Sequence, residues 1–504
     1  MTSTPGRTPA TEDPYAPGVA QTGRQVSWNY LVFALSRSST LIMMVILARI
    51  LTPADFGLFA LALLVLNVFD YTKDLGVTLS LVQLRGPWQR LAPTGLTLSV
   101  VFGFLASAAA LFLAPIIAAG LRHPELVPLV QVLGAGLLIS SLGAVPVSLL
   151  RRQIDFRGRL VPEVSGALVK TVLSVGLALA GLGVWSLIWG QLAASVLTSL
   201  MYWGVARTTV RPGFDRSVAV ELTRFGLPAT LVSLVAFGIY NCDYVAIGRQ
   251  LGDEQLGFYT LAYRLPELVV LMLCNTVSEV LFSSLSRWQH DRAALADHYM
   301  SAVRVVLALA APLGFGMAAL APETVEVLYG RDYSESANEL AVLAVFTVIY
   351  AVTFHSGDVY KATGRAALLT LINLGKFVVL APAVWFAAHR DILAVAVTVL
   401  AVEVLHCAVR LFMIRWVIGV SFSRQLRTFS GPLAAGAGMA LFVWSAAHLV
   451  EPAPLPIRVV ALLALGGALY AGFVRIFAPD LFRQGEAVLR TFRRSRSAGG
   501  GDPR

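Results

Sequence analysis

Arg49-Ile-Leu-Thr-Pro-Ala-Asp-Phe-Gly57-Leu-Phe-Ala-Leu-Ala62 is a short turn between two apolar runs, and the turn recurs 200 residues later. The second copy reads Arg249-Gln-Leu-Gly-Asp-Glu-Gln-Leu-Gly257-Phe-Tyr-Thr-Leu-Ala262. Arginine, two leucines, glycine and alanine keep the same register in both copies. A repeat at this spacing predicts two similar halves joined in one chain.

The composition restricts the class of protein. The 504 residues are 57% hydrophobic and 13% charged, with a mean hydropathy of +0.73. Soluble domains carry about 25% charged residues, so this chain lacks the charged surface of a soluble globule. The composition also excludes a disordered chain and a disulfide-rich scaffold. Cys242, Cys274 and Cys407 all lie in apolar runs, which excludes a disulfide framework or a metal quartet. The sequence therefore predicts a polytopic membrane protein.

The apolar runs are long and continuous, which favours helices over the short alternating strands of a membrane barrel. Residues 1–25 are polar and proline-containing, and we expect a disordered cytoplasmic tail there rather than a signal peptide. About 14 spans are predicted, at roughly 26–48, 58–82, 92–120, 126–150, 160–181, 184–206, 226–248, 257–285, 297–320, 338–360, 366–388, 391–415, 430–448 and 456–478.

The basic residues predict the orientation of the chain. With the N-terminus in the cytoplasm, about 26 of the 39 Lys and Arg residues fall on the cytoplasmic side and 6 fall in outer turns. Cytoplasmic loops of membrane proteins carry such an excess. An error of one span would remove the contrast in basic residues between the two sides of the membrane. The charge pattern therefore supports an even number of spans, with both termini in the cytoplasm. The outer turn at residues 322–339 is acidic, with no Lys and only Arg331 as a cation.

Six spans separate the two copies of the repeated turn, and an even number gives both halves the same orientation. The sequence thus predicts an all-α polytopic protein with two six-helix lobes related by a parallel repeat. The N-lobe covers 26–206 and the C-lobe 226–415. Two extra helices occupy 430–478, and 479–504 is a basic cytoplasmic tail.

The turn at Ala48–Ala60 resembles the first outer turn of Wzx-like polysaccharide flippases, which belong to the multidrug/oligosaccharidyl-lipid/polysaccharide (MOP) superfamily. Asp74-Leu-Gly76 and Lys361-Ala-Thr-Gly-Arg365 are similar to segments of the same family. The resemblance covers about residues 25 to 480. It implies two lobes around a central cavity that work by alternating access. The implied cargo is a polyprenyl-pyrophosphate-linked oligosaccharide for lipopolysaccharide or exopolysaccharide biosynthesis, carried across the bacterial cytoplasmic (inner) membrane.

Ionisable residues inside the spans are the candidate functional residues, because charges in a membrane are costly and face protein or water. A pyrophosphate needs compensating cations when it leaves water, and Arg or Lys in a wet cavity supplies them. The candidates for substrate binding are Arg37, Lys73, Lys170, Arg304 and Lys376. Arg37, Lys170 and Lys376 have no counter-ion close in sequence, and we expect them to line one cavity between the lobes.

Asp70, Lys73 and Asp74 share one helical face, because they lie three and four residues apart. Asp74, and after it Asp70, are candidates for coupling transport to a gradient of H⁺ or Na⁺, since desolvation raises a carboxyl pKa. A local neutralising triad around Lys73 is the alternative. Arg264 and Glu267, three residues apart, are expected to pair with each other, and His406 is expected to be a packing residue.

No nucleotide-binding loop, zinc-protease motif or nucleophile triad is present in the sequence, so neither an enzyme nor a cofactor or metal site is expected. The expected partners are the lipid-linked glycan, membrane lipids and a polysaccharide polymerase, with no nucleic acid. Four alternatives stay open: a peptidoglycan-precursor flippase, a drug exporter of the same fold, a membrane glycosyl polymerase or ligase, and a symporter of another two-lobe fold. The sequence does not identify the sugar, the coupling ion, the oligomeric state or the role of spans 13 and 14.

Overall fold

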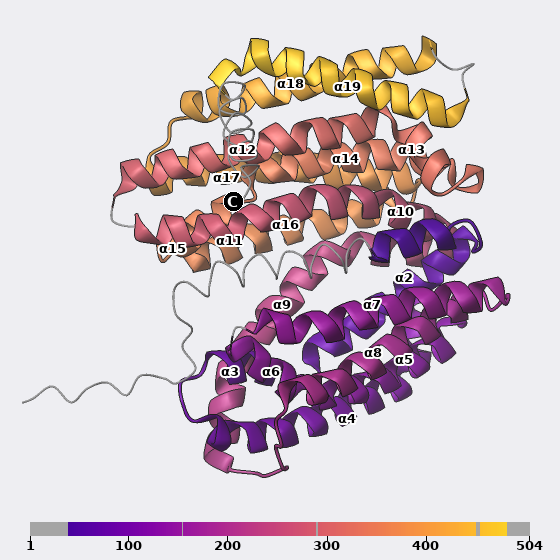
Figure 1. Cartoon of the computed structure of the whole chain (residues 1–504), viewed down its shortest axis with the longest axis vertical. Helices are drawn as coiled ribbons and strands as arrows, with labels where there is room; N and C mark the ends of the chain where they lie inside the picture. The colour runs from indigo at the N-terminus through magenta and orange to yellow at the C-terminus, as the bar shows by residue number, and fades with distance from the viewer. Residues whose placement is uncertain (1–38, 154, 289–290, 450–453, 481–504) are drawn as a thin grey trace, which may run out of the picture. The chain divides into compact units, whose positions relative to one another are not determined.

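A computed structural model describes residues 39–153, 155–288, 291–449 and 454–480 of the chain (Figure 1). Every regular element in this part of the chain is helical. Twelve of the helices are long and apolar enough to cross a membrane, and a bent helix pair raises the number to 13. The predicted all-helical membrane fold is therefore confirmed. Most of the predicted span 26–48 lies outside the described residues, so 14 spans stay a prediction.

The helices follow the predicted apolar runs in order, and several runs are split into two helices. Their bounds are α2 Pro53–Thr72, α3 Val77–Gln83, α4 Trp88–Leu121, α5 Leu126–Leu142, α6 Ala144–Arg152, α7 Phe156–Leu179, α8 Val184–Ala206, α9 Arg216–Gln250, α10 Asp253–Pro266, η1 Glu267–Leu271, α11 Met272–Arg287, α12 Arg292–Ala319, α13 Ala321–Leu328, η2 Arg331–Tyr333, α14 Ser336–Thr353, α15 Ser356–Ala362, α16 Ala366–Ala387, α17 Ile392–Ile418, α18 Phe422–Leu449 and α19 Leu455–Phe477.

The chain forms two compact units. The described part of unit 1 comprises residues 39–43, 65–118, 124–153 and 155–234, and unit 2 comprises 44–64, 119–123 and the described residues from 235 onward. These boundaries cross the predicted lobes, because residues 44–64 belong to unit 2 and the first half of α9 belongs to unit 1. The division into lobes at 26–206 and 226–415 stays a prediction.

Unit 1 has an apolar core where α3, α4, α6 and the beginning of α9 meet. Val77, Leu81, Leu91 and Leu222 are buried there. Beside this core, the turn before α3 touches α9 backbone to backbone: a Cβ added to Gly76 would lie 2.5 Å from the carbonyl oxygen of Gly226. Gly76 also has a φ of 76°, which favours glycine.

The larger apolar core of unit 2 is built from α11, α12, α15 and α17. Tyr299, Val303 and Leu307 of α12 are fully buried in it. The helix α12 also packs against α18, which in turn packs against α19, so the C-terminal helices form an added layer on this unit (Figure 1).

The two repeated turns lie against each other within unit 2. A Cβ added to Gly57 would lie 1.7 Å from the carbonyl oxygen of Asp253, and one added to Gly257 would lie 1.9 Å from that of Pro53. The contact is reciprocal, since each glycine abuts the start of the other helix. Both turns therefore lie at the same end of the helices, and only glycine fits at either position.

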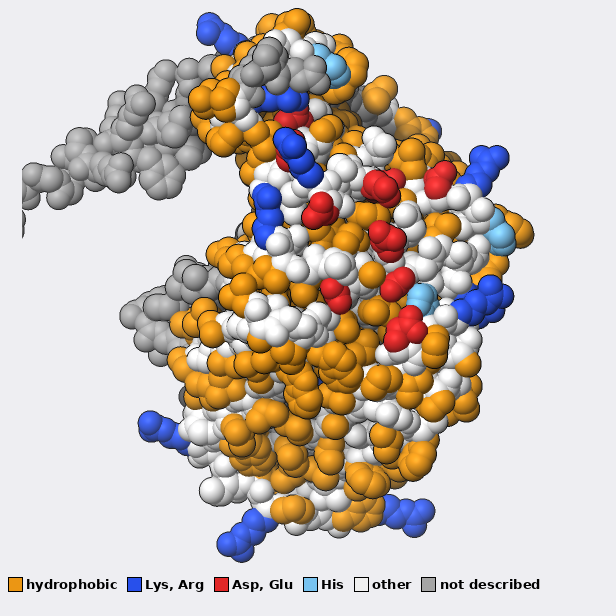
Figure 2. All heavy atoms as spheres, turned by 90° about the vertical axis from the view of Figure 1, so that its right-hand side faces the viewer, with side chains coloured by type: hydrophobic (Ala, Val, Ile, Leu, Met, Phe, Trp, Pro, Cys, Tyr) orange, Lys and Arg blue, Asp and Glu red, His pale blue; other side chains and the backbone are white. Residues whose placement is uncertain are grey.

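Tyr333, in the predicted acidic turn between α13 and α14, covers this contact. Its ring meets the rings of Phe56 and Phe258 edge-on, at 6.2 and 6.1 Å, and its hydroxyl donates to the carbonyl of Leu51 at 2.8 Å. Arg49 donates to the carbonyl of Val327 at 2.5 Å. Figure 2 shows several Asp and Glu side chains gathered on the face that lies on the right of Figure 1.

Interruptions occur at corresponding spans of the two sequence halves. In the first half, α2 and α3 are separated by the turn 73–76, and α5 and α6 meet at a bend of 47° at Gly143. In the second half, the π-helix η1 separates α10 from α11, and α14 and α15 are separated at residues 354–355. Broken spans in matching positions of a repeat often mark the binding region of a transporter.

Candidate substrate cavity

Unit 1 contains a cavity of about 610 Å³, bounded by both broken spans of the first half and by α7 and α8. Polar and small side chains make up most of its wall. The lining residues are Asp70, Lys73, Asp74, Thr78, Ser140, Gly143, Ala144, Val147, Arg151, Glu163, Gly166, Ala167, Lys170, Gln191, Ala194, Ser195, Thr198, Ser199 and Tyr202. Four residues predicted from the sequence, Asp70, Lys73, Asp74 and Lys170, thus share one cavity.

Lys73 lies at the break between α2 and α3 and is held by two partners. Its ammonium group donates to Asp70 Oδ1 at 2.7 Å and to Ser140 Oγ at 2.8 Å. The Lys73 side chain is 16% exposed, whereas the Asp70 side chain is 49% exposed. The cation is therefore fixed across two broken spans, while its carboxylate partner faces the open side.

Asp74 is turned toward the backbone. Its Oδ1 accepts the N–H of Gly76 at 3.0 Å, and its Oδ2 accepts the N–H of Thr78 at 3.1 Å. These two bonds satisfy donors at the start of α3, as capping side chains do at helix N-termini. The expected triad around Lys73 thus contains one ion pair, with Asp70. Asp74 stabilises the turn that interrupts the span, and its role in ion coupling stays a prediction.

Lys170 and Arg151 bring further positive charge to the cavity from two other helices. Lys170 lies on α7 and is partly buried, and Arg151 lies in the last turn of α6 and is exposed. The sequence placed Arg151 in a cytoplasmic break outside any site. The signal that could have located it is Gly143, which bends the predicted span 126–150 and leads α6 along the cavity wall.

Glu163 of α7 and Tyr202 of α8, which sequence reasoning missed, also line the cavity. Glu163 Oε1 accepts a hydrogen bond from Arg159 Nη2 at 2.8 Å and one from the Tyr202 hydroxyl at 3.2 Å. Three carboxylates and three cations line the cavity in total. Among these carboxylates, Asp70 forms an ion pair with a cation of the cavity wall, Lys73.

In unit 2, the predicted cation Lys376 lies in a buried ion pair. Lys376 Nζ lies 2.5 Å from Glu403 Oε2, and the two side chains are 7% and 0% exposed. His406 Nδ1 lies 3.4 Å from the other oxygen of Glu403, in agreement with its expected packing role. Lys376 has no partner close in sequence, and the structure supplies one from α17.

The remaining sequence candidates lie elsewhere. Arg304 of α12 pairs with Asp480 at 3.6 Å in unit 2. Arg264 and Glu267 pair at 3.0 Å, as expected from their spacing. Arg37 lies outside the described residues. Their substrate-binding roles, where proposed, stay predictions.

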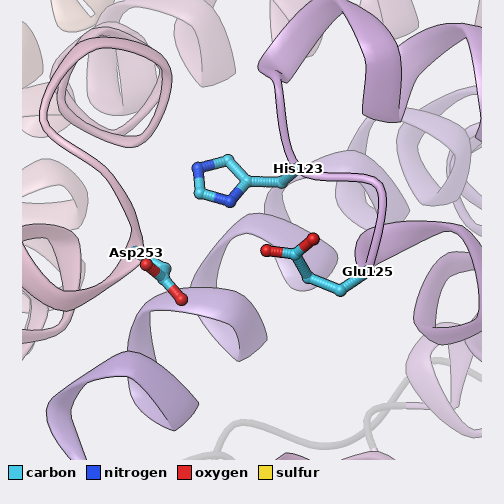
Figure 3. A group of neighbouring side chains, drawn as sticks. All are labelled: His123, Glu125 and Asp253. Atoms are coloured by element: carbon cyan, nitrogen blue, oxygen red, sulfur yellow. The ribbon is translucent and has the colours of Figure 1, made fainter.

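The imidazole of His123 lies near the Asp253 carboxylate of the same unit (Figure 3). One ring nitrogen, Nε2, lies 2.9 Å from the carbonyl oxygen of Gly248, so a hydrogen bond accounts for its position. Asp253 belongs to the same unit as His123, whereas Glu125 belongs to unit 1. These residues therefore provide no basis for a metal site within one unit.

The sequence profile of the polysaccharide biosynthesis protein family matches residues 46–338, more than half of the chain. This chain belongs to that family. The succinoglycan biosynthesis transport protein ExoT of Rhizobium meliloti is 27% identical over 468 residues, which are 92% of this chain and 94% of the relative. The lipopolysaccharide biosynthesis protein WzxC of Escherichia coli is 24% identical over 403 residues, 79% of this chain and 82% of the relative.

The fold is that of the MOP superfamily. The lipid II flippase MurJ in an inward closed conformation aligns with a TM-score of 0.72 and 15% identity, over 90% of this chain and 99% of that chain. A multidrug transporter of the superfamily aligns with a TM-score of 0.62 and 17% identity, over 77% and 94%. The expected Wzx-like family is confirmed, and the fold is the one that the resemblance implied. The chain is a multi-pass membrane transporter for polysaccharide biosynthesis, and not an enzyme.

Proposed function

We propose that this protein moves a polyprenyl-pyrophosphate-linked oligosaccharide from the cytoplasmic to the outer leaflet of a bacterial cytoplasmic membrane by alternating access. The observation that carries the proposal is the polar cavity of unit 1, to which the turn after α2 contributes Lys73, α7 contributes Lys170 and α6 contributes Arg151. A pyrophosphate carries charge that Lys and Arg compensate by charge-assisted hydrogen bonds. The small polar residues of α8 leave room and hydrogen-bonding groups for a sugar.

Lys73, Lys170 and Arg151 are proposed to hold the pyrophosphate, with Arg37 and Arg304 as the further cations that the sequence suggests. Lys376 was predicted to share this task, but its buried pair with Glu403 favours a structural role. Asp70 is the proposed coupling carboxylate for H⁺ or Na⁺, since it is half exposed and pairs with Lys73. Loading of Asp70 with a cation would release Lys73 for the cargo.

The cargo is tested with the purified protein in vesicles. We expect faster flipping of a polyprenyl-pyrophosphate-linked oligosaccharide than of the same lipid with an uncharged linkage. Equal rates for both would contradict a cationic pyrophosphate site. A peptidoglycan precursor and a cationic drug serve as the alternative cargoes, and preference for either would replace the proposed substrate.

The proposed topology has 14 spans, two six-helix lobes, two extra C-terminal helices and both termini in the cytoplasm. The basic breaks and the acidic outer turn support it. Single cysteines at the exposed Ser334 and Ser423, in a variant without the native cysteines, test it. A membrane-impermeant thiol reagent added outside should label position 334 and leave 423 unlabelled. Labelling of 423 from outside would overturn this orientation.

A further inference from the structure

A second, smaller cavity, of about 230 Å³, lies in unit 2 where three helices have an end. The helix α12 begins there, and α15 and α17 terminate there. Arg292, Thr363 and Arg365 supply its polar wall, and Leu295, Val417 and Ile418 supply an apolar wall. Arg365 is the last residue of the Lys361–Arg365 segment, and this segment has no role in the proposed transport mechanism.

The guanidinium group of Arg365 is held in place by stacking, but not all of its N–H groups have a hydrogen-bond partner. It stacks over the ring of Trp416 with the Cζ atom 4.6 Å from the ring centre. Its Nη1 atom is buried and has no hydrogen-bond partner among the described residues. A fixed guanidinium with a spare donor is suited to a phosphate oxygen, and Arg292 adds a second guanidinium to the same cavity.

The carboxylates near this cavity are engaged by other groups. Asp291 accepts the N–H groups of Ala293 and Ala294 at the start of α12. Asp358 accepts a hydrogen bond from Ser278 at 2.6 Å, and Asp297 pairs with Arg424. Among the described residues, none of these carboxylates forms an ion pair with Arg292 or Arg365, so both guanidinium groups are available to an anion.

The surface of α17 next to the cavity favours a lipid over a free anion. Trp416 is 63% exposed and Phe412 is 54% exposed, so aromatic rings line the surface just beside the charged pocket. Aromatic side chains of this kind are enriched where a membrane meets water. A headgroup in the cavity would leave its acyl chains along these rings.

We propose that this cavity binds the phosphate headgroup of an anionic phospholipid, with Arg365 and Arg292 as the phosphate ligands and α17 as the surface for the acyl chains. The cytoplasmic leaflet is the source, since it holds anionic lipids. That assignment of side rests on the topology in the proposed function. The site itself is separate from the cavity of unit 1 and needs no knowledge of the cargo.

The test measures lipid binding to the full-length protein in a neutral detergent, through the rise in Tm on titration with phosphatidylglycerol. Phosphatidylcholine and inorganic phosphate are the comparison ligands. The variants are Arg365→Gln and Arg292→Gln. Arg427→Gln is the matched control, because Arg427 is exposed on α18 and does not line the cavity.

Phosphatidylglycerol should raise the Tm of the wild type and of Arg427→Gln by at least about 2 °C more than phosphatidylcholine does. Either cavity variant should weaken the apparent affinity at least about tenfold. Equal responses of all four proteins would overturn the site, and an equal response to inorganic phosphate would overturn the lipid as its ligand. If Arg365→Gln does not fold, Arg292→Gln decides. No flipping is measured, so this outcome is independent of the proposed cargo.

Discussion

Lys170 and Lys376 lie in the fifth span of their sequence halves, α7 and α16, but in very different surroundings. Lys170 lines the 610 Å³ cavity of unit 1, together with side chains from three other spans. Lys376 is 7% exposed and lies 2.5 Å from Glu403 within unit 2. Both halves carry a lysine in this span, yet one faces a cavity and the other is enclosed with a counter-ion.

The difference separates charges that can meet a ligand from charges that hold the protein together. An intramembrane lysine must face protein or water. Enclosure with a buried carboxylate meets this requirement by itself, so Lys376 needs no cargo to explain it. A lysine on a polar cavity is accessible to an anion. The first half of the repeat therefore contains the proposed substrate cavity, and the corresponding lysine of the second half lies in a closed ion pair.

The largest expected effect comes from breaking the enclosed pair. Glu403→Gln leaves the Lys376 ammonium buried without its charge partner, and removal of one member of a buried pair costs about 3–5 kcal/mol. Its counterpart in unit 1, Asp70→Asn, removes the half-exposed partner of Lys73 and should cost at most about 1 kcal/mol. Thermal unfolding in detergent measures both. Equal losses of Tm would remove the contrast between the two regions.

A medium effect is expected from deleting one tyrosine hydroxyl in each region. The hydroxyl of Tyr259 donates to Asp243 at 2.7 Å in the interior of unit 2, and that of Tyr202 donates to Glu163 at 3.2 Å on the cavity wall. Tyr259→Phe deprives a buried carboxylate of a donor and should cost about 1–3 kcal/mol. Tyr202→Phe should cost about 0.5–1.5 kcal/mol, since Glu163 keeps Arg159. A greater loss of Tm in Tyr202→Phe would contradict this order.

The smallest effect is predicted for removing both members of the enclosed pair. Replacement of a buried ion pair by apolar residues of similar size is often neutral. The double variant Lys376→Met, Glu403→Leu should therefore regain most of the Tm lost in Glu403→Gln and keep a near-normal rate of flipping. A stable double variant that no longer transports would show instead that Lys376 contacts the cargo, as the sequence alone suggested.

Much of the architecture was predictable because hydrophobicity, charge and repetition act over short stretches. The apolar runs predicted the helices, and the repeated turn predicted that Gly57 and Gly257 occupy equivalent positions in the two halves. The three-residue spacing of Asp70 and Lys73 predicted their ion pair. In each case the relevant partner lies within one helix turn, or in a second copy of the same sequence.

Features that depend on pairing between distant segments were not predictable. Glu403 is 27 residues from Lys376 and on another helix, so no local pattern joins them. Arg151 reaches the cavity wall because the chain bends at Gly143, which looks like one more small residue in an apolar run. Asp74 caps a helix that begins inside a predicted span. Bends and caps of this kind decide whether a charged side chain faces a cavity or is enclosed by protein, and the sequence does not show where they occur.

The central claim is that the cations of the unit 1 cavity hold the pyrophosphate of the cargo. The most direct measurement compares flipping of a polyprenyl-pyrophosphate-linked oligosaccharide in vesicles containing the wild type, Lys170→Gln, Lys170→Glu or Arg331→Gln. Arg331 is a suitable control, because its side chain is 89% exposed and lies outside the cavity. Lys170→Gln should slow flipping at least about tenfold at an unchanged Tm. Lys170→Glu should be slower still, and Arg331→Gln should match the wild type. Wild-type flipping by both Lys170 variants would contradict the claim.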